Sequence, residues 1–115
     1  MREIKFRGRK INTNKWIVGN LGYTKTSGGN SGILVEGKLH IVDSKTVGQY
    51  TGLKDSKGNE IYEGDMILVF EWNRKYKVVF EKGMFKASGS TTFSLVTVTN
   101  GELSCEVIGN IYENQ

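Results

Sequence analysis

Three carboxylates lie close together in this 115-residue sequence: Glu60, Glu63 and Asp65. Such a group can supply a general acid and a general base, or bind a divalent cation. The alternative is that Asp65 caps a turn ahead of a strand, with both glutamates in solvent. We favour the alternative, because no catalytic constellation assembles around these three positions.

The remaining residues that could do nucleophilic chemistry are isolated. His40 is the only histidine, and no serine or cysteine nucleophile is near it in sequence, so a surface or pairing role is favoured. Cys105 lies in a predicted strand and is expected to be inert, because a nucleophilic cysteine needs a positioned base. Zinc ligands are too few, and neither a phosphate-binding loop nor a dinucleotide fingerprint is present. The sequence therefore predicts a protein that is not an enzyme and has no metal site and no cofactor.

An aromatic and basic group at Trp72, Arg74, Lys75 and Tyr76 suits binding instead. Aromatic rings stack on nucleic-acid bases, and the cations can hold a phosphate. In the alternative interpretation, Trp72 closes the mouth of a barrel and the two cations face solvent. The sequence leaves both interpretations open.

A second basic group lies near the N-terminus and includes Arg7, Arg9 and Lys10. Residues 1–15 hold six lysines and arginines against one glutamate, so their net charge of +5 exceeds the +4 of the whole chain. Such a cluster attracts phosphates or an acidic protein surface. It is also typical of a solvated sheet edge kept soluble by cations, and we favour that interpretation.

The elements that position these groups are predicted to be strands. Helical periodicity is weak, and 15 glycines punctuate the chain. In the first half, the pattern predicts strands at residues 3–7 and 16–23, a mobile loop between residues 23 and 33, and a hairpin of residues 33–35 and 39–42.

In the second half, turns and short strands are expected over residues 46–65. A meander should follow at residues 66–72, 76–81 and 84–87. Asn100-Gly101 predicts a type I′ hairpin between residues 93–99 and 103–107. A final strand is expected at residues 107–112.

Four stretches resemble the motifs of a known family and occur in the same order as in that family. They are residues 2–8 (REIKFRG), 46–55 (TVGQYTGLKD), 57–65 (KGNEIYEGD) and 107–114 (VIGNIYEN). Together they resemble the YopX family of phage and prophage proteins. The resemblance implies a phage or prophage origin and an SH3-type small β-barrel in the C-terminal half. The motif residues are expected to be structural: Gly48, Gln49, Tyr50, Thr51, Gly52, Leu53, Asp55, Gly58, Glu63, Gly64 and Asp65.

Residues 24–45 and 88–104 do not match the family pattern, and partner choice is expected there if it resides in variable loops. The expected fold is all-β or mainly β. A length of 115 residues suits one domain, here residues 1–45 with the N-terminal strands and variable loop, and 46–115 with the turn-rich motif and barrel. No apolar run is long enough for a membrane helix, and the charged start lacks a signal-peptide core, so we expect a location in the bacterial host cytoplasm.

The leading hypothesis for function is a non-enzymatic phage accessory protein that binds a host or phage macromolecule. A protein partner is favoured, and inhibition of a host defence is one candidate use. The alternative is a nucleic-acid-binding module that uses the basic N-terminus and the aromatic and basic turn. Exposed strand edges also make a homo-oligomer a candidate.

Overall fold

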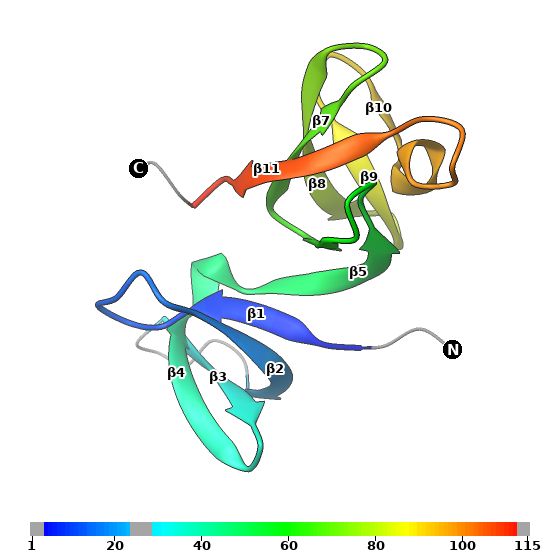
Figure 1. Ribbon diagram of the computed structural model, residues 1–115. Coiled ribbons are helices and arrows are strands. Elements are labelled where there is room, and N and C mark those ends of the chain that lie inside the picture. The colour runs from blue at the N-terminus through cyan, green and yellow to red at the C-terminus, as the bar shows by residue number, and fades with distance from the viewer. Residues whose placement is uncertain (1–3, 24–28, 113–115) are drawn as a thin grey trace. The chain divides into compact units, whose positions relative to one another are not determined.

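The computed structural model describes residues 4–23 and 29–112, and its regular elements there are strands and two short 3-10 helices (Figure 1). The prediction of an all-β fold is confirmed. The chain divides into two compact units, Met1–Tyr50 and Thr51–Gln115. Most of the predicted mobile loop, residues 24–28, lies outside the described residues.

The first unit is an antiparallel sheet in the order β4-β3-β2-β1. Its strands are β1 (Phe6–Arg9), β2 (Trp16–Tyr23), β3 (Asn30–Val35) and β4 (Lys38–Asp43). The 3-10 helix η1 (Ser44–Thr46) then leads to β5 (Gly48–Lys54), whose first residues pair with β1.

The predicted hairpin between β3 and β4 is confirmed, and its connection is two residues long. Glu36 and Gly37 have φ angles of 50° and 83°. Two successive positive φ angles are the requirement of a type I′ turn, whose twist matches that of the strands beside it.

The end of β1 reaches β4, so the sheet of the first unit curls. Lys10 forms an isolated bridge with Val42. Gly8 lies over the core, where an added Cβ would come within 2.7 Å of Val42 Cγ2 and 3.2 Å of Ile33 Cδ1. Glycine is therefore needed for β1 to close over the buried residues Ile17, Ile33 and Val42.

The second unit contains the end of β5, which pairs with β6 (Glu60–Tyr62), and a five-stranded antiparallel sheet. That sheet has the order β10-β9-β8-β7-β11 and is built from β7 (Asp65–Val69), β8 (Arg74–Glu81), β9 (Met84–Ser88), β10 (Thr92–Ser94) and β11 (Cys105–Asn110). In the described residues β10 and β11 are the two edges of this sheet and do not pair with each other. The sheet is open, so the predicted SH3-type barrel is not confirmed.

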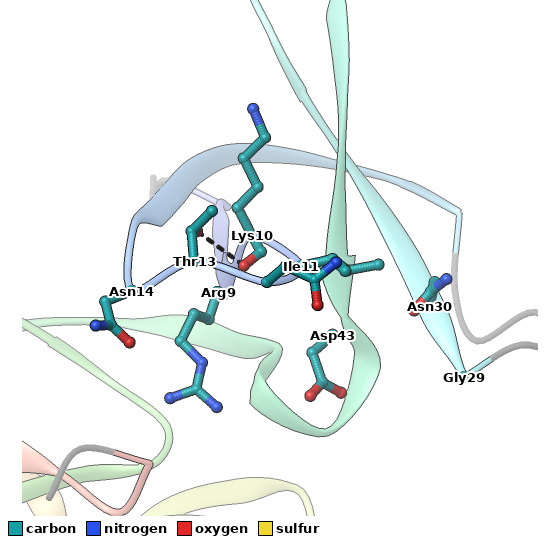
Figure 2. Close-up of a pocket in the computed structure, with 9 residues that line it drawn as sticks. Arg9, Lys10, Ile11, Thr13, Asn14, Gly29, Asn30 and Asp43 are labelled. Atoms are coloured by element: carbon teal, nitrogen blue, oxygen red, sulfur yellow. Dashed lines mark hydrogen bonds between the residues drawn. The ribbon is translucent and has the colours of Figure 1, made fainter.

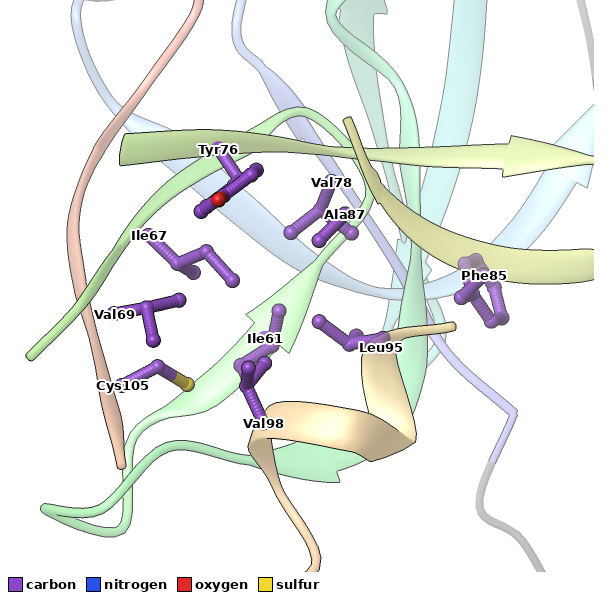
Figure 3. Close-up of a cluster of buried hydrophobic side chains, with 10 residues drawn as sticks. All are labelled: Ile61, Ile67, Val69, Tyr76, Val78, Phe85, Ala87, Leu95, Val98 and Cys105. Carbon is purple, nitrogen blue, oxygen red and sulfur yellow. The ribbon is translucent and has the colours of Figure 1, made fainter. Parts of the chain in front are cut away.

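Ten buried side chains form the core of the second unit (Figure 3). Leu95 and Val98, on the 3-10 helix η2 (Leu95–Val98), point toward Ile61 and the sheet. The other members are Ile67, Val69, Tyr76, Val78, Phe85, Ala87 and Cys105.

Two local predictions in this unit were wrong. The hairpin around Asn100-Gly101 does not form: β10 pairs with β9, β11 pairs with β7, and residues 95–98 turn into η2. Of the pair, only Gly101 has a positive φ, so the two residues do not make a type I′ turn. The strand predicted at residues 66–72 also ends early, at Val69.

Candidate binding surfaces

Trp72 lies in the turn between β7 and β8, and not at a strand end as predicted. The N–H of Asn73 donates to the carbonyl of Phe70 at 3.2 Å, and Asn73 has a φ of 51°. Asparagine tolerates this left-handed conformation better than most residues. The turn leaves the Trp72 side chain 41% exposed.

Two further rings hold Trp72. Its ring meets those of Phe93 and Tyr76 in edge-to-face geometry, with centroids 5.4 Å and 6.2 Å apart. Phe93 and Tyr76 are themselves 4.9 Å apart, and Tyr76 is buried in the core. Each such pair stabilises the fold by roughly 0.5–1.5 kcal/mol beyond the contribution of the buried area. The indole is therefore exposed, but its orientation is held by the two neighbouring rings.

An open cavity of about 380 Å³ lies beside this ring, lined by Trp72, Arg74, Tyr76, Ser90 and Thr91. Gly89 precedes the lining residue Ser90 and packs closely against Tyr76, since an added Cβ would lie 2.7 Å from Cδ2 of the tyrosine. Three predicted site residues, Trp72, Arg74 and Tyr76, are therefore brought together.

Lys75 is not part of this cavity. Successive strand residues face opposite sides of a sheet, so Lys75 faces away from Arg74 and Tyr76. It shares its face with its cross-strand neighbour Leu68. The predicted group of four is thus divided between the two faces of the sheet.

Arg7, Arg9 and Lys10 lie in the first unit, and Arg7 and Arg9 contact other parts of it. The Arg7 guanidinium is 4.9 Å from the centroid of the Trp16 ring, a cation–π distance. The backbone N–H of Arg9 donates to Oγ1 of Thr46 at 2.9 Å.

Arg9 and Lys10 also line an open polar cavity of about 620 Å³ (Figure 2). The Lys10 side chain extends away from that of Arg9, and the carboxylate of Asp43 lies on the same side as the Arg9 guanidinium. Asn12, Thr13, Asn14 and Asn30 supply most of the other polar groups. The cavity thus combines two cations with one carboxylate.

The outward face of the first unit's sheet was missed by the sequence analysis. It exposes four aliphatic side chains: Val18 (42%), Leu34 (37%), Leu39 (47%) and Ile41 (37%). We call these four the aliphatic face. The signal was present in the sequence, because β3 and β4 carry apolar residues in both phases of the strand alternation.

Three strands contribute to the aliphatic face, and its residues on β3 and β4 are in contact. Leu34 on β3 is the direct cross-strand partner of Leu39 on β4. An added Cβ at Gly22 on β2 would lie 3.0 Å from Leu39 Cδ1 and 3.3 Å from Leu34 Cγ, so both leucines cover this glycine. At the β1 side, Val18 lies opposite Arg7, which puts a cation at the rim.

Within the family-like block from Gly48 to Asp65, Asp55 accepts hydrogen bonds from its own loop and from β11. Its Oδ1 accepts the N–H groups of Lys57 and Asn59, at 2.9 and 2.8 Å. Its Oδ2 accepts the Asn59 side-chain amide at 3.1 Å and the N–H of Val107 on β11 at 2.9 Å. Burial alone would raise the pKa of Asp55, but these hydrogen bonds outweigh it and hold the pKa below the ordinary value of 3.8.

Other residues of the block satisfy backbone groups or turns. Thr51 donates its hydroxyl to the carbonyl of Ile61 at 2.8 Å, and Tyr50 donates its N–H to the carbonyl of Lys5 at 2.8 Å. Leu53 packs against the core of the second unit, and Gln49 pairs with Phe6 on β1. Gly52, Gly58 and Gly64 have φ angles of 84°, 85° and 94°, which disfavour other residues.

The three carboxylates at 60, 63 and 65 have separate surroundings. Asp65 is buried, and its Oδ2 accepts the N–H of Tyr62 at 2.7 Å across the β6–β7 turn. Glu60 accepts a hydrogen bond from the Tyr62 hydroxyl at 3.0 Å. Glu63 is half-buried in the turn itself. In the described part of the chain, no group of three or more His, Cys, Asp or Glu side chains could hold a metal ion.

His40 and Cys105 are both strand residues. His40 pairs with Ile33 between β3 and β4. Cys105 is fully buried on β11, and burial raises the pKa of its thiol to about 11. At neutral pH it therefore remains a thiol, which is a poor nucleophile.

A family model described as YopX protein matches residues 5–115. The chain belongs to the YopX family. The resemblance predicted from the four sequence stretches is thereby confirmed, and the match also includes residues 24–45 and 88–104, where no family pattern was recognised in the sequence. No curated protein matches the chain.

The YopX match covers both units, so the aliphatic face and the Trp72 cavity both lie in the family's domain. Ser90 and Thr91 of the cavity lie within residues 88–104, and three residues of the aliphatic face, Leu34, Leu39 and Ile41, lie within residues 24–45. Within the described residues, no helix is long and apolar enough to cross a membrane.

Proposed function

We propose that this chain is a non-enzymatic phage or prophage accessory protein that acts by binding a host or phage protein. Membership of the YopX family supports the phage or prophage setting. The observation that carries the proposal is the aliphatic face of Val18, Leu34, Leu39 and Ile41.

Exposing four aliphatic side chains on one face of a sheet to water is unfavourable in free energy. Each Å² of apolar surface removed from water contributes about 25 cal/mol, so a partner that covers this face gains affinity from it. Contiguous apolar patches with a polar rim mark protein interaction sites more often than scattered single residues do.

Charge supports a partner of a particular kind. Residues 1–50 hold nine lysines and arginines against three acidic residues, a net charge of +6. Arg7 lies at the rim of the aliphatic face, opposite Val18. The partner surface that fits has an apolar centre and acidic residues around it, which would also speed encounter. Inhibition of a host defence protein is one form that such binding takes.

The experiment compares two variants of equal charge change. Leu39→Asp places a carboxylate in the aliphatic face, and Val96→Asp places one on η2 of the second unit, where Val96 is 51% exposed. A partner captured from lysogenic or infected cells by the unmodified chain is purified, and its Kd is measured for all three proteins. We expect Leu39→Asp to weaken binding at least tenfold and Val96→Asp to leave it within about twofold.

Equal binding by the two variants would place the partner elsewhere and end the proposal. Far-ultraviolet circular dichroism of both variants separates lost binding from lost folding. Raising the salt concentration should also weaken binding of the unmodified chain, because the acidic rim of the partner is then screened from the first unit.

A further inference from the structure

We propose that the Trp72 cavity of the second unit binds one unpaired base of a single-stranded nucleic acid, with Arg74 at the adjoining phosphate. This site is separate from the aliphatic face and does not depend on the protein-binding function. The site combines an exposed ring held in place by two others, an open cavity beside that ring and a cation in the cavity wall.

The orientation of the Trp72 ring is fixed by its neighbours. A base stacks well on an aromatic side chain whose orientation is already fixed, because little conformational entropy is then lost. Phe93 and Tyr76 fix Trp72 through edge-to-face contacts at 5.4 and 6.2 Å, while 41% of the Trp72 side chain stays exposed. A tryptophan needed only for the core would be covered further.

The cavity wall supplies the polar groups. Ser90 and Thr91 line it with hydroxyl groups, which both donate and accept hydrogen bonds and so tolerate any base edge. Gly89 keeps this wall close to Tyr76, because an added Cβ would meet the tyrosine ring at 2.7 Å. These groups predict stacking with little preference for base identity.

Arg74 is the cation that can reach a phosphate beside the stacked base. The nearby acid in the same turn, Glu71, is engaged elsewhere: its two oxygens accept the N–H and the hydroxyl of Ser104 at 2.9 and 2.8 Å. The hydrogen bonds from Ser104 lower the pKa of Glu71, so the carboxylate stays ionised and keeps these two hydrogen bonds.

The net charge of the second unit limits the electrostatic part of binding at this site. Residues 51–115 hold seven lysines and arginines against nine acidic residues, a net charge of −2. Stacking on Trp72 should therefore supply most of the binding free energy. With about one phosphate neutralised, log affinity should fall with log salt with a slope of about −0.7, which is much shallower than for a basic groove.

The test is a fluorescence anisotropy titration of the full chain with labelled oligo-dT, oligo-rU and a duplex at several salt concentrations. Single strands should bind and the duplex should not, because its bases are not free to stack. The tighter of the two single strands identifies DNA or RNA as the source. Trp72→Ala should weaken binding roughly 5- to 150-fold, with the salt slope unchanged.

Lys75 supplies the matched control for Arg74, since it is the next residue and faces the other side of the sheet. Arg74→Ala should flatten the salt slope to near zero, and Lys75→Ala should leave both slope and affinity within about twofold. Trp72→Phe keeps an aromatic ring and should retain most of the affinity, which guards against a Trp72→Ala chain that fails to fold. Equal affinity for duplex and single strands, equal effects of Arg74→Ala and Lys75→Ala, or no binding at low salt would overturn the proposal.

Discussion

The two units use their apolar residues differently. In the second unit, ten buried side chains form one core, and the sheet and η2 both contribute to it. The described core cluster of the first unit has three buried residues, Ile17, Ile33 and Val42, while four aliphatic side chains stay exposed on the other face of its sheet. The difference indicates that the second unit has the larger packed core, whereas the first unit leaves one face of its sheet with four exposed aliphatic side chains.

The largest expected effect tests the core of the second unit. Ile67 is fully buried on β7, and Ile67→Ala should lower the free energy of unfolding by about 2–5 kcal/mol, since the substitution leaves a cavity. Urea denaturation followed by circular dichroism measures the loss.

Two valines on η2 provide the control for that measurement. Val98 is buried and Val96 is 51% exposed, so the same substitution to alanine removes the same atoms from different surroundings. Val98→Ala should cost more than about 1.5 kcal/mol, and Val96→Ala less than about 0.5 kcal/mol. Equal costs would mean that η2 does not pack as described.

The second prediction concerns the hydrogen bonds that Asp55 accepts. Asp55→Ala leaves the N–H of Val107 and the amides of the loop without their acceptor, so we expect a loss of about 1–3 kcal/mol of unfolding free energy. The same denaturation experiment at pH 7 checks this.

The pH dependence of Asp55 follows from the direction of its pKa shift. Its folded pKa lies below the ordinary value of 3.8, so the unfolded chain takes up the proton first. The stabilising contribution is therefore complete above about pH 4–5 and is lost as the pH falls through 3.8 toward the folded pKa. Asp55→Asn should remove that part of the acid sensitivity. If its profile between pH 2 and 5 matches that of the unmodified chain, the carboxylate does not have this role.

Gly8 tests the core of the first unit. An alanine there would overlap Val42 Cγ2, so Gly8→Ala should cost about 1–3 kcal/mol of stability. Val42→Ala in the same chain makes room, and the double variant should be more stable than the sum of the two single effects predicts. Simple additivity would show that the two residues do not touch.

Much of this fold could be predicted from the sequence, since strand alternation and glycine turns are local signals. The range of β2 at residues 16–23 and the hairpin turn at Glu36-Gly37 follow from such signals. The Asn100-Gly101 pair was misleading for a physical reason: Leu95 and Val98 reach the core three residues apart on a 3-10 turn, and this long-range packing overrides the local turn preference.

The candidate sites were harder to predict from the sequence than the strands, because they depend on tertiary contacts. The contact of Trp72 with Phe93 joins residues 21 positions apart, and no local sequence pattern predicts it. The separation of Lys75 from Arg74 required the exact start of β8, which lies at Arg74 and was predicted two residues later, at Tyr76. The aliphatic face was hidden because consecutive apolar residues in a strand are equally typical of burial on both sides.

The smallest expected effect tests the central claim most directly, namely that the aliphatic face is free for a partner and is not part of the core. Leu39 is 47% exposed, so Leu39→Ser should change the free energy of unfolding, measured by urea denaturation, by less than about 1 kcal/mol. A loss of several kcal/mol, comparable to that of Ile67→Ala, would show that Leu39 belongs to the packed interior and would contradict this account.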